Sequence, residues 1–191
     1  MEHKGTIRIE TEHLILRPFA QEDAPAAFRN WMHDARVTKY LRWTPHRELS
    51  ETETTLRRWI EQYEQLDFYQ WAIVPKDLGE PVGTISVVDQ EERVAKLHIG
   101  YCIGVPWWGK GYTAEAFAAL IPFFFDEVGA GRIEAQHDPK NPNSGRVMRK
   151  AGLRHEATLR RADWNNTGIV DAELYALLAE EYRLQREKKN P

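Results

Sequence analysis

Apolar and polar positions alternate along the chain with two different periods, and these periods predict its strands and helices. Strand-like runs lie at 7–9, 14–16, 70–74, 82–88, 97–105, 132–136, 159–164 and 172–178. Helical patterns, in which apolar residues recur at helical spacing, lie at 23–31, 50–66, 114–128 and 144–151. At the start of the second helix, Ser50 is the expected N-cap and Glu53 completes a capping box.

The order of these elements predicts an α/β fold of the mixed α+β kind. Turn residues at 75–77 and 89–92 join the strands between residues 70 and 105 into an antiparallel meander. A strand–helix–strand–helix unit follows, so we expect a mixed sheet with helices on both faces. No repeat or linker divides the sequence. Residues 1–191 are therefore expected to form one domain, with 184–191 as a frayed tail.

Composition and charge limit the classes of function. A net charge of −3 and a pI near 6.2 argue against direct binding to nucleic acid or to an anionic membrane. The single cysteine, Cys102, provides neither a disulfide framework nor the spacing of a zinc site. The first ten residues contain no apolar signal core, and no apolar run approaches the ~18 residues of a membrane span. We expect a cytoplasmic protein without a metal.

The sequence Trp-Gly-Lys-Gly-Tyr-Thr at 108–113 predicts a phosphate-binding loop. It follows an apolar strand and precedes an alanine-rich helical pattern. Gly109 and Gly111 allow backbone N–H groups to approach an anion closely. The helix that follows would direct its dipole and its unpaired amides at the same place.

Two kinds of phosphate ligand fit this loop. Residues 104–111 nearly match the P-loop of nucleotide-binding proteins, but Gly111 stands where a P-loop has the hydroxyl that binds magnesium. Residues 121–126 could be the apolar strand that ends in a metal-binding Asp. That run begins too soon after Gly111 for a parallel crossover, so the pattern favours a helix there and disfavours the P-loop.

A second interpretation of the loop accounts for four segments along the chain, whereas the P-loop alternative accounts for only one. Leu-Ile-Leu-Arg-Pro lies at 14–18, Ile-Gly-Tyr at 99–101 leads into the loop, Asn-Pro-Asn-Ser at 141–144 precedes Lys-Ala-Gly-Leu at 150–153, and a last segment covers 171–182. In this order they resemble the GNAT superfamily of N-acetyltransferases, and most closely the ribosomal-protein N-terminal acetyltransferases of the RimJ/RimL type. The resemblance implies a mostly antiparallel sheet of six to seven strands that is splayed where acetyl-CoA binds.

The resemblance also implies which residues bind acetyl-CoA. The loop amides would hold the pyrophosphate, the strand backbone would pair with the pantetheine arm, and Asn141 would bind the pantetheine amides. The residues concerned are Ile103, Val105, Trp108, Gly109, Lys110, Gly111, Tyr112, Thr113, Asn141 and Ser144. Thr113 departs from the family, which usually has Gly or Ala there. Gly104 and Pro106 favour an opening of the sheet beside them.

Two residues are candidates for catalysis. Many superfamily members have a Glu as the base just before the Ile-Gly-Tyr step, and His98 occupies that position here. A neutral imidazole can accept a proton, whereas the alternative is a strand histidine bonded to a neighbouring backbone. Ser144 matches the serine proposed to protonate the departing thiolate. Its alternative role is to cap the helix at 144–151.

The reaction implied by the resemblance requires a neutral amine, which has the lone pair that attacks the thioester. At pH 7 an α-amino group, with a pKa of about 8, is neutral far more often than a lysine with a pKa of about 10.4. We therefore expect a protein N-terminal amine or a small-molecule amine as the acceptor, bound between residues 28 and 69. A non-catalytic acyl-CoA-binding module is the alternative function, and exposed sheet edges are compatible with a homodimer.

Overall fold

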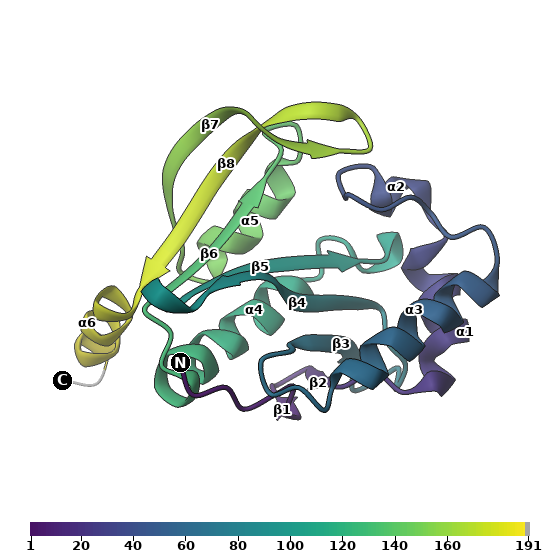
Figure 1. The fold of residues 1–191 in the computed structure, drawn as a ribbon, viewed down its shortest axis with the longest axis horizontal. Helices are drawn as coiled ribbons and strands as arrows, with labels where there is room; N and C mark the ends of the chain where they lie inside the picture. The colour runs from purple at the N-terminus through teal and green to yellow at the C-terminus, as the bar shows by residue number, and fades with distance from the viewer. Residues whose placement is uncertain (190–191) are drawn as a thin grey trace.

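An eight-stranded sheet forms the centre of the protein (Figure 1). The computed structural model describes residues 1–189. The strands are β1 (Ile9–Glu10), β2 (Leu14–Arg17), β3 (Gln70–Pro75), β4 (Gly83–Glu91), β5 (Lys96–Ile103), β6 (Arg132–His137), β7 (Arg154–Asn165) and β8 (Gly168–Leu178). They lie in the order β1-β2-β3-β4-β5-β6-β8-β7. Only β5 and β6 pair in parallel, so the sheet is mixed and mostly antiparallel as predicted, with at least one strand more than expected.

Helices cover both faces of the sheet. They are α1 (Ala24–Ala27), α2 (Ala35–Thr38), α3 (Leu49–Gln62), α4 (Tyr112–Pro122), α5 (Pro142–Lys150) and α6 (Ala179–Lys189). Short π-helical segments, Phe28–Met32 and Phe123–Val128, extend α1 and α4. The second extension begins directly after Pro122, which has no N–H for the regular helix bond. Residues 121–126 are thus helical, which removes the strand that the P-loop alternative needed.

Two clusters of buried side chains hold these layers together. On one face Leu97 and Ile99 of β5 pack with Phe117 and Leu120 of α4 in a cluster that α5 also joins. On the other face Ala72 and Val74 of β3 belong to a cluster with residues of α1 and α3. β3 is buried along its whole length because both faces are covered. Within residues 1–189, no helix is long and apolar enough to cross a membrane.

Several of the predicted element ends differ from the structure. Glu48, not Ser50, precedes the first turn of α3, and the Ser50 hydroxyl donates to Glu48 Oε1 over 2.6 Å from inside the helix. The helix also ends at Gln62 instead of 66. The expected frayed tail is helical as far as Lys189, and residues 190–191 lie outside the described chain.

The sheet opens between β5 and β6. The two strands pair only at Lys96 with Arg132, Leu97 with Ile133, and His98 with Glu134, although both continue beyond the last pair. The opening therefore begins earlier than the expected position beside Gly104 and Pro106. The bulge lies in β4, between Val87 and Asp89.

Gly100 makes room for that bulge. A Cβ atom on Gly100 would lie 2.6 Å from Cγ1 of Val88, the bulged residue, which is closer than two carbon atoms can approach. A bulge bends its strand and increases the local twist. The bulge lies beside His98, at the level where β5 separates from β6.

Candidate active site

The loop at 104–111 connects β5 to α4 and takes the conformation that its glycines permit. Gly109 and Gly111 have φ angles of 77° and 90°, in the left-handed region that other residues rarely adopt. The Trp108 indole Nε1 donates to the Ile103 carbonyl over 2.8 Å and closes the loop against the end of β5. Val105 lies past the strand in a 3₁₀ turn, and its carbonyl accepts the Trp108 amide. The prediction that the Val105 backbone extends the strand is therefore wrong.

Backbone amides are free where this loop enters α4. Within residues 1–189, the N–H groups of Gly109, Gly111, Tyr112, Thr113 and Ala114 donate to no protein oxygen. Gly111 is the N-cap, so Thr113 lies inside the helix and is buried. Four of these five amides lie in the N-cap and first turn of an eleven-residue helix, where the helix dipole also favours negative charge. The arrangement fits an anion such as a phosphate.

Asn141 and Ser144 lie at the start of α5, on the same face of the sheet as α4. Asn141 is the N-cap, so the alternative role of Ser144 as the cap is wrong. The Asn141 side-chain amide donates to Ser144 Oγ over 3.0 Å. Tyr101 of β5 donates its hydroxyl to the Ser144 carbonyl over 2.9 Å, and its ring lies 5.9 Å from that of Phe117 in α4. The three elements thus meet around Tyr101.

His98 lies on the opposite face of the sheet. Ile99 packs toward α4, and successive side chains of a strand alternate between faces, so His98 points away from α4. Its Nδ1 lies 3.2 Å from Oε1 of Glu134, the residue beside it on β6. The alternative of a histidine bonded to a neighbouring backbone is therefore wrong, since the partner is a carboxylate.

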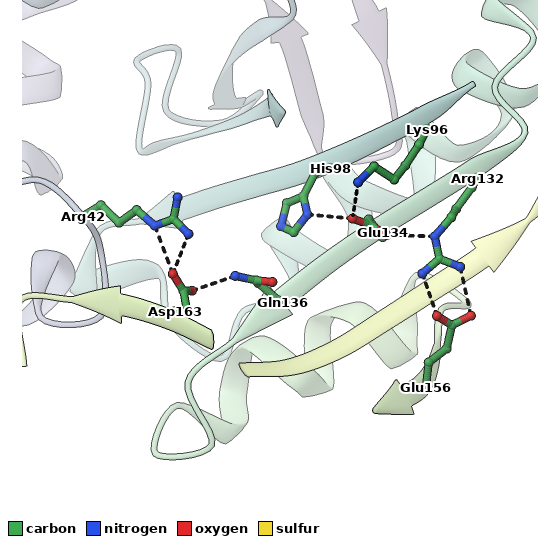
Figure 2. A network of polar contacts seen from close by, with 8 residues as sticks. All are labelled: Arg42, Lys96, His98, Arg132, Glu134, Gln136, Glu156 and Asp163. Atoms are coloured by element: carbon green, nitrogen blue, oxygen red, sulfur yellow. Dashed lines mark hydrogen bonds and ion pairs between the residues drawn. The ribbon is translucent and has the colours of Figure 1, made fainter. Parts of the chain in front are cut away.

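Glu134 is the centre of a charge cluster formed by Lys96, His98, Arg132, Glu134 and Glu156 (Figure 2). Lys96 Nζ lies 3.2 Å from Glu134 Oε1, and Arg132 Nε donates to Oε2 over 2.8 Å. Arg132 also holds Glu156 through two hydrogen bonds of 3.0 and 2.6 Å. The hydrogen bond from His98 is the largest cause that lowers the pKa of Glu134 to about 2, and the bonds from Arg132 and Lys96 add to it. The Glu134 carboxylate is therefore charged at neutral pH.

A second polar group lies further along the same face (Figure 2). Gln136 of β6 donates to Asp163 Oδ2 over 2.8 Å, and Arg42 Nε donates to Asp163 Oδ1 over 3.2 Å. Burial disfavours the charged form of Asp163, yet the bonds from Arg42, the Trp164 amide and Gln136 leave its pKa below the usual value. A carboxylate held in this way is a weak base.

The loop after α2 reaches the turn between β7 and β8 on this face. The Asn166 side-chain amide donates to the carbonyls of Thr38 and Trp43, each over 2.8 Å. Figure 1 shows α2 beside the end of the β7–β8 hairpin. With the pair of Arg42 and Asp163, these contacts join two distant parts of the chain next to the opening between β5 and β6.

A cavity of about 290 Å³ lies at the bulge of β4. Its lining residues are Gln65, Asp67, Phe68, Tyr69, Val87, Val88, Asp89 and Gln90. Asp89 is the register partner of His98 across β4 and β5. Part of the expected acceptor region, residues 65–69, lies here, whereas Trp31 of the same region is a fully buried core residue.

The sequence did not identify the partners of His98. Alternation along β6 was a usable signal, because Arg132, Glu134 and Gln136 share one face of the strand, while Ile133 and Ala135 lie on the other. Nothing in the sequence predicted that this face of β6 would lie beside His98 and Arg42, because the contacts join residues that lie far apart in the chain.

Comparisons of the sequence find a family model and relatives that match most of the chain. Residues 13–154 match the model of the Acetyltransferase (GNAT) domain. The chain is 30% identical over 174 residues to the uncharacterized N-acetyltransferase p20 of Bacillus licheniformis, covering 90% of this chain and 96% of that protein. It is 26% identical over 157 residues to the ribosomal protein uS5-alanine N-acetyltransferase of Escherichia coli, covering 78% and 79%.

A solved structure has a similar fold. It is the ribosomal-protein α-N-acetyltransferase RimL in complex with coenzyme A, with a TM-score of 0.81 and 20% identity. The alignment covers 92% of this chain and 99% of that one.

Proposed function

Because the chain belongs to the GNAT acetyltransferase family, we propose that it transfers the acetyl group of acetyl-CoA to a protein N-terminal amine or a small-molecule amine. Residues 1–191 would act as one domain. The observation that carries the proposal is the opening between β5 and β6. Free backbone amides lie on one face of the sheet near this opening, and a histidine whose partner is a carboxylate lies on the other face.

The loop at 104–111 fits the pyrophosphate of coenzyme A. The free amides at 109 and 111–114 can donate to phosphate oxygens, and the left-handed glycines hold them in place. The edge of β5 beyond His98 has no neighbouring strand, so Ile103 and the residues before it can pair with the pantetheine arm. The similar RimL structure is itself a complex with coenzyme A, which supports this assignment.

Acetyl-CoA, when bound, supplies the acetyl group as a thioester. His98 accepts the proton that the amine must lose, directly or through water. The Tyr101 bond to the Ser144 carbonyl holds the first turn of α5 against β5, and this positions the Ser144 hydroxyl on the α4 and α5 side of the opening. From there Ser144 can donate a proton to the departing thiolate. This donation adds little, because a free thiol already ionises near pH 8.5.

The acceptor is proposed to approach on the face of His98. An N-terminal amine suits a single histidine base, because about a tenth of such groups are already neutral at pH 7. The E. coli relative acts on the alanine of a ribosomal protein, which supports a protein N-terminus as one acceptor class. A lysine side chain would need about 3 kcal/mol more assistance from the site.

A screen of amines with a thiol-detecting readout tests the proposal. The purified chain is mixed with acetyl-CoA and with peptides of differing N-terminal residue, polyamines or aminoglycosides. We expect amine-dependent release of coenzyme A with at least one peptide N-terminus or small amine. Binding of acetyl-CoA without release for any acceptor would instead favour the non-catalytic module.

A further inference from the structure

Glu134 holds His98 at the last paired position before the opening. His98 on β5 and Glu134 on β6 are register partners, and neither strand pairs with the other beyond them. The two side chains share one face, and both are nearly buried, with 15% and 10% of their side-chain surfaces exposed. A carboxylate bound at this place fixes the ring of His98 relative to the opening.

The charge state of Glu134 decides which nitrogen of His98 carries the proton. A carboxyl group with a pKa of about 2 is ionised at neutral pH and can only accept hydrogen bonds. The contact of 3.2 Å with Nδ1 must therefore be a donation from Nδ1–H. A neutral imidazole has one N–H, so Nε2 is left bare and can accept a proton. In Figure 2 the second ring nitrogen points away from Glu134.

Neighbouring cations balance the carboxylate. A lone carboxylate beside an imidazole favours the protonated ring, which cannot act as a base. Here Lys96 and Arg132 share Glu134, and Arg132 also holds Glu156, so the cluster around His98 has two cations and two carboxylates. Other charged groups on this face include Asp89 and Glu91, opposite His98 and Lys96 on β4, and the pair of Arg42 and Asp163.

We propose that Glu134 is the positioning residue for His98: it fixes the ring with its proton on Nδ1 and so presents a bare Nε2 as the base. This inference rests on the proposed role of His98. Lys96 and Arg132 limit the charge that Glu134 imposes on the ring. In this role Glu134 acts through its contact with His98 and does not itself exchange a proton with the amine.

The tautomer can be measured without any acceptor. In ¹⁵N NMR of histidine-labelled protein, the His98 signals are those that disappear in His98→Gln. Above the pH at which the ring loses its charge, we expect the Nδ1–H form in the wild type. In Glu134→Gln the side chain can donate as well as accept, so both tautomers become populated. A wild-type ring in the Nε2–H form would overturn the proposal, even if Glu134→Gln failed to fold.

Kinetics separate positioning from general stabilisation. With acetyl-CoA and the fastest acceptor of the screen, Glu134→Gln should lower kcat about tenfold. It should also move the acid limb of the kcat/KM profile to lower pH, because loss of the negative charge disfavours protonation of the ring. Glu156→Gln removes the other carboxylate of Arg132 but does not touch His98. It should leave the acid limb in place.

The double variant distinguishes failure of this inference from failure of the proposed function. If Glu134 acts through His98, Glu134→Gln should cause no further loss of kcat in His98→Gln. An equal loss in both backgrounds would overturn the positioning role. If His98→Gln itself keeps the wild-type rate and pH profile, the base assignment fails and the positioning role falls with it, while the acetyltransferase activity stands.

Discussion

The loop before α4 and the face around His98 are built in opposite ways. The loop takes its binding groups from the backbone of one continuous segment, in which Gly109 and Gly111 adopt left-handed angles and the following amides stay free. The face around His98 takes its groups from side chains of β5, β6 and β7 and from the loop after α2. The first region is a local property of the sequence, whereas the second exists only in the folded chain.

The comparison suggests a division of labour across the opening. Backbone donors suit a ligand with fixed charge, because they carry no proton that titrates near neutral pH. A histidine with a carboxylate suits the step that moves a proton. Changes on one side of the opening should therefore affect binding of acetyl-CoA, and changes on the other should affect the rate of transfer.

The largest effect is expected for His98→Ala, which removes the proposed base. Removal of a general base lowers kcat by about a hundredfold or more, and the loss should shrink as the pH rises and more of the amine is already neutral. Steady-state release of coenzyme A across pH 6 to 10 measures it. His155→Ala is the matched control, since His155 also pairs with a glutamate on a strand but lies on β7, outside the charge cluster. A parallel loss in both variants would contradict the assignment.

The second prediction concerns the stability of the His98 face. Because the pKa of Glu134 is lowered from 4.5 to about 2, its charged form stabilises the fold at pH values above 4.5. This contribution is lost as the pH falls from 4.5 through about 2. Wild type should exceed Glu134→Gln by on the order of 2 kcal/mol in free energy of unfolding at pH 7. Urea denaturation at several pH values should show the difference narrowing below pH 4.5. A difference that is constant with pH would show that the charge of Glu134 is not its source.

The third prediction addresses the loop. Gly109→Ala places a side chain at a φ angle of 77°, which costs about 1–2 kcal/mol and should turn the amides away from their common direction. We expect the Kd for acetyl-CoA to rise about tenfold. Gly79→Ala is matched in strain, with a φ angle of 76° and equally open space, but lies in the turn between β3 and β4. Gly79→Ala should lose about as much stability as Gly109→Ala but keep the wild-type affinity for acetyl-CoA. Equal affinities for acetyl-CoA in the two variants would contradict the role of the loop.

The smallest effect is expected at Ser144. Because the thiolate leaves readily without a proton, Ser144→Ala should lower kcat by less than about fivefold at pH 7. Its stability should change little, since Asn141 and not Ser144 precedes the first turn of α5. Stopped-flow release of coenzyme A and thermal unfolding measure the two quantities. A loss as large as that of His98→Ala would make Ser144 a principal catalytic group.

Sequence periodicity predicted the order of the main strands and helices and the antiparallel meander of β3, β4 and β5. It misplaced features set by packing between distant segments. The opening lies beside the bulge at Val88 and Gly100, not beside Gly104 and Pro106. Ser50 has the chemistry of an N-cap, but Glu48 occupies that position.

The same limit applies to the site. Gly109 and Gly111 predicted the loop because left-handed geometry is encoded residue by residue. Glu134 could be assigned to a face of its strand, yet its contact with His98 depends on a parallel pairing of only three residue pairs. Arg42 and Asp163 form a hydrogen bond although they lie 121 positions apart in the sequence, and no local pattern predicts that contact.

The most direct test of the division across the opening is the binding of acetyl-CoA to His98→Ala, measured by titration calorimetry at pH 7. If the loop binds and His98 only moves the proton, the Kd should stay within about twofold of the wild-type value while kcat falls about a hundredfold. If the affinity falls as far as kcat does, the two faces are not separate in function and the account is wrong.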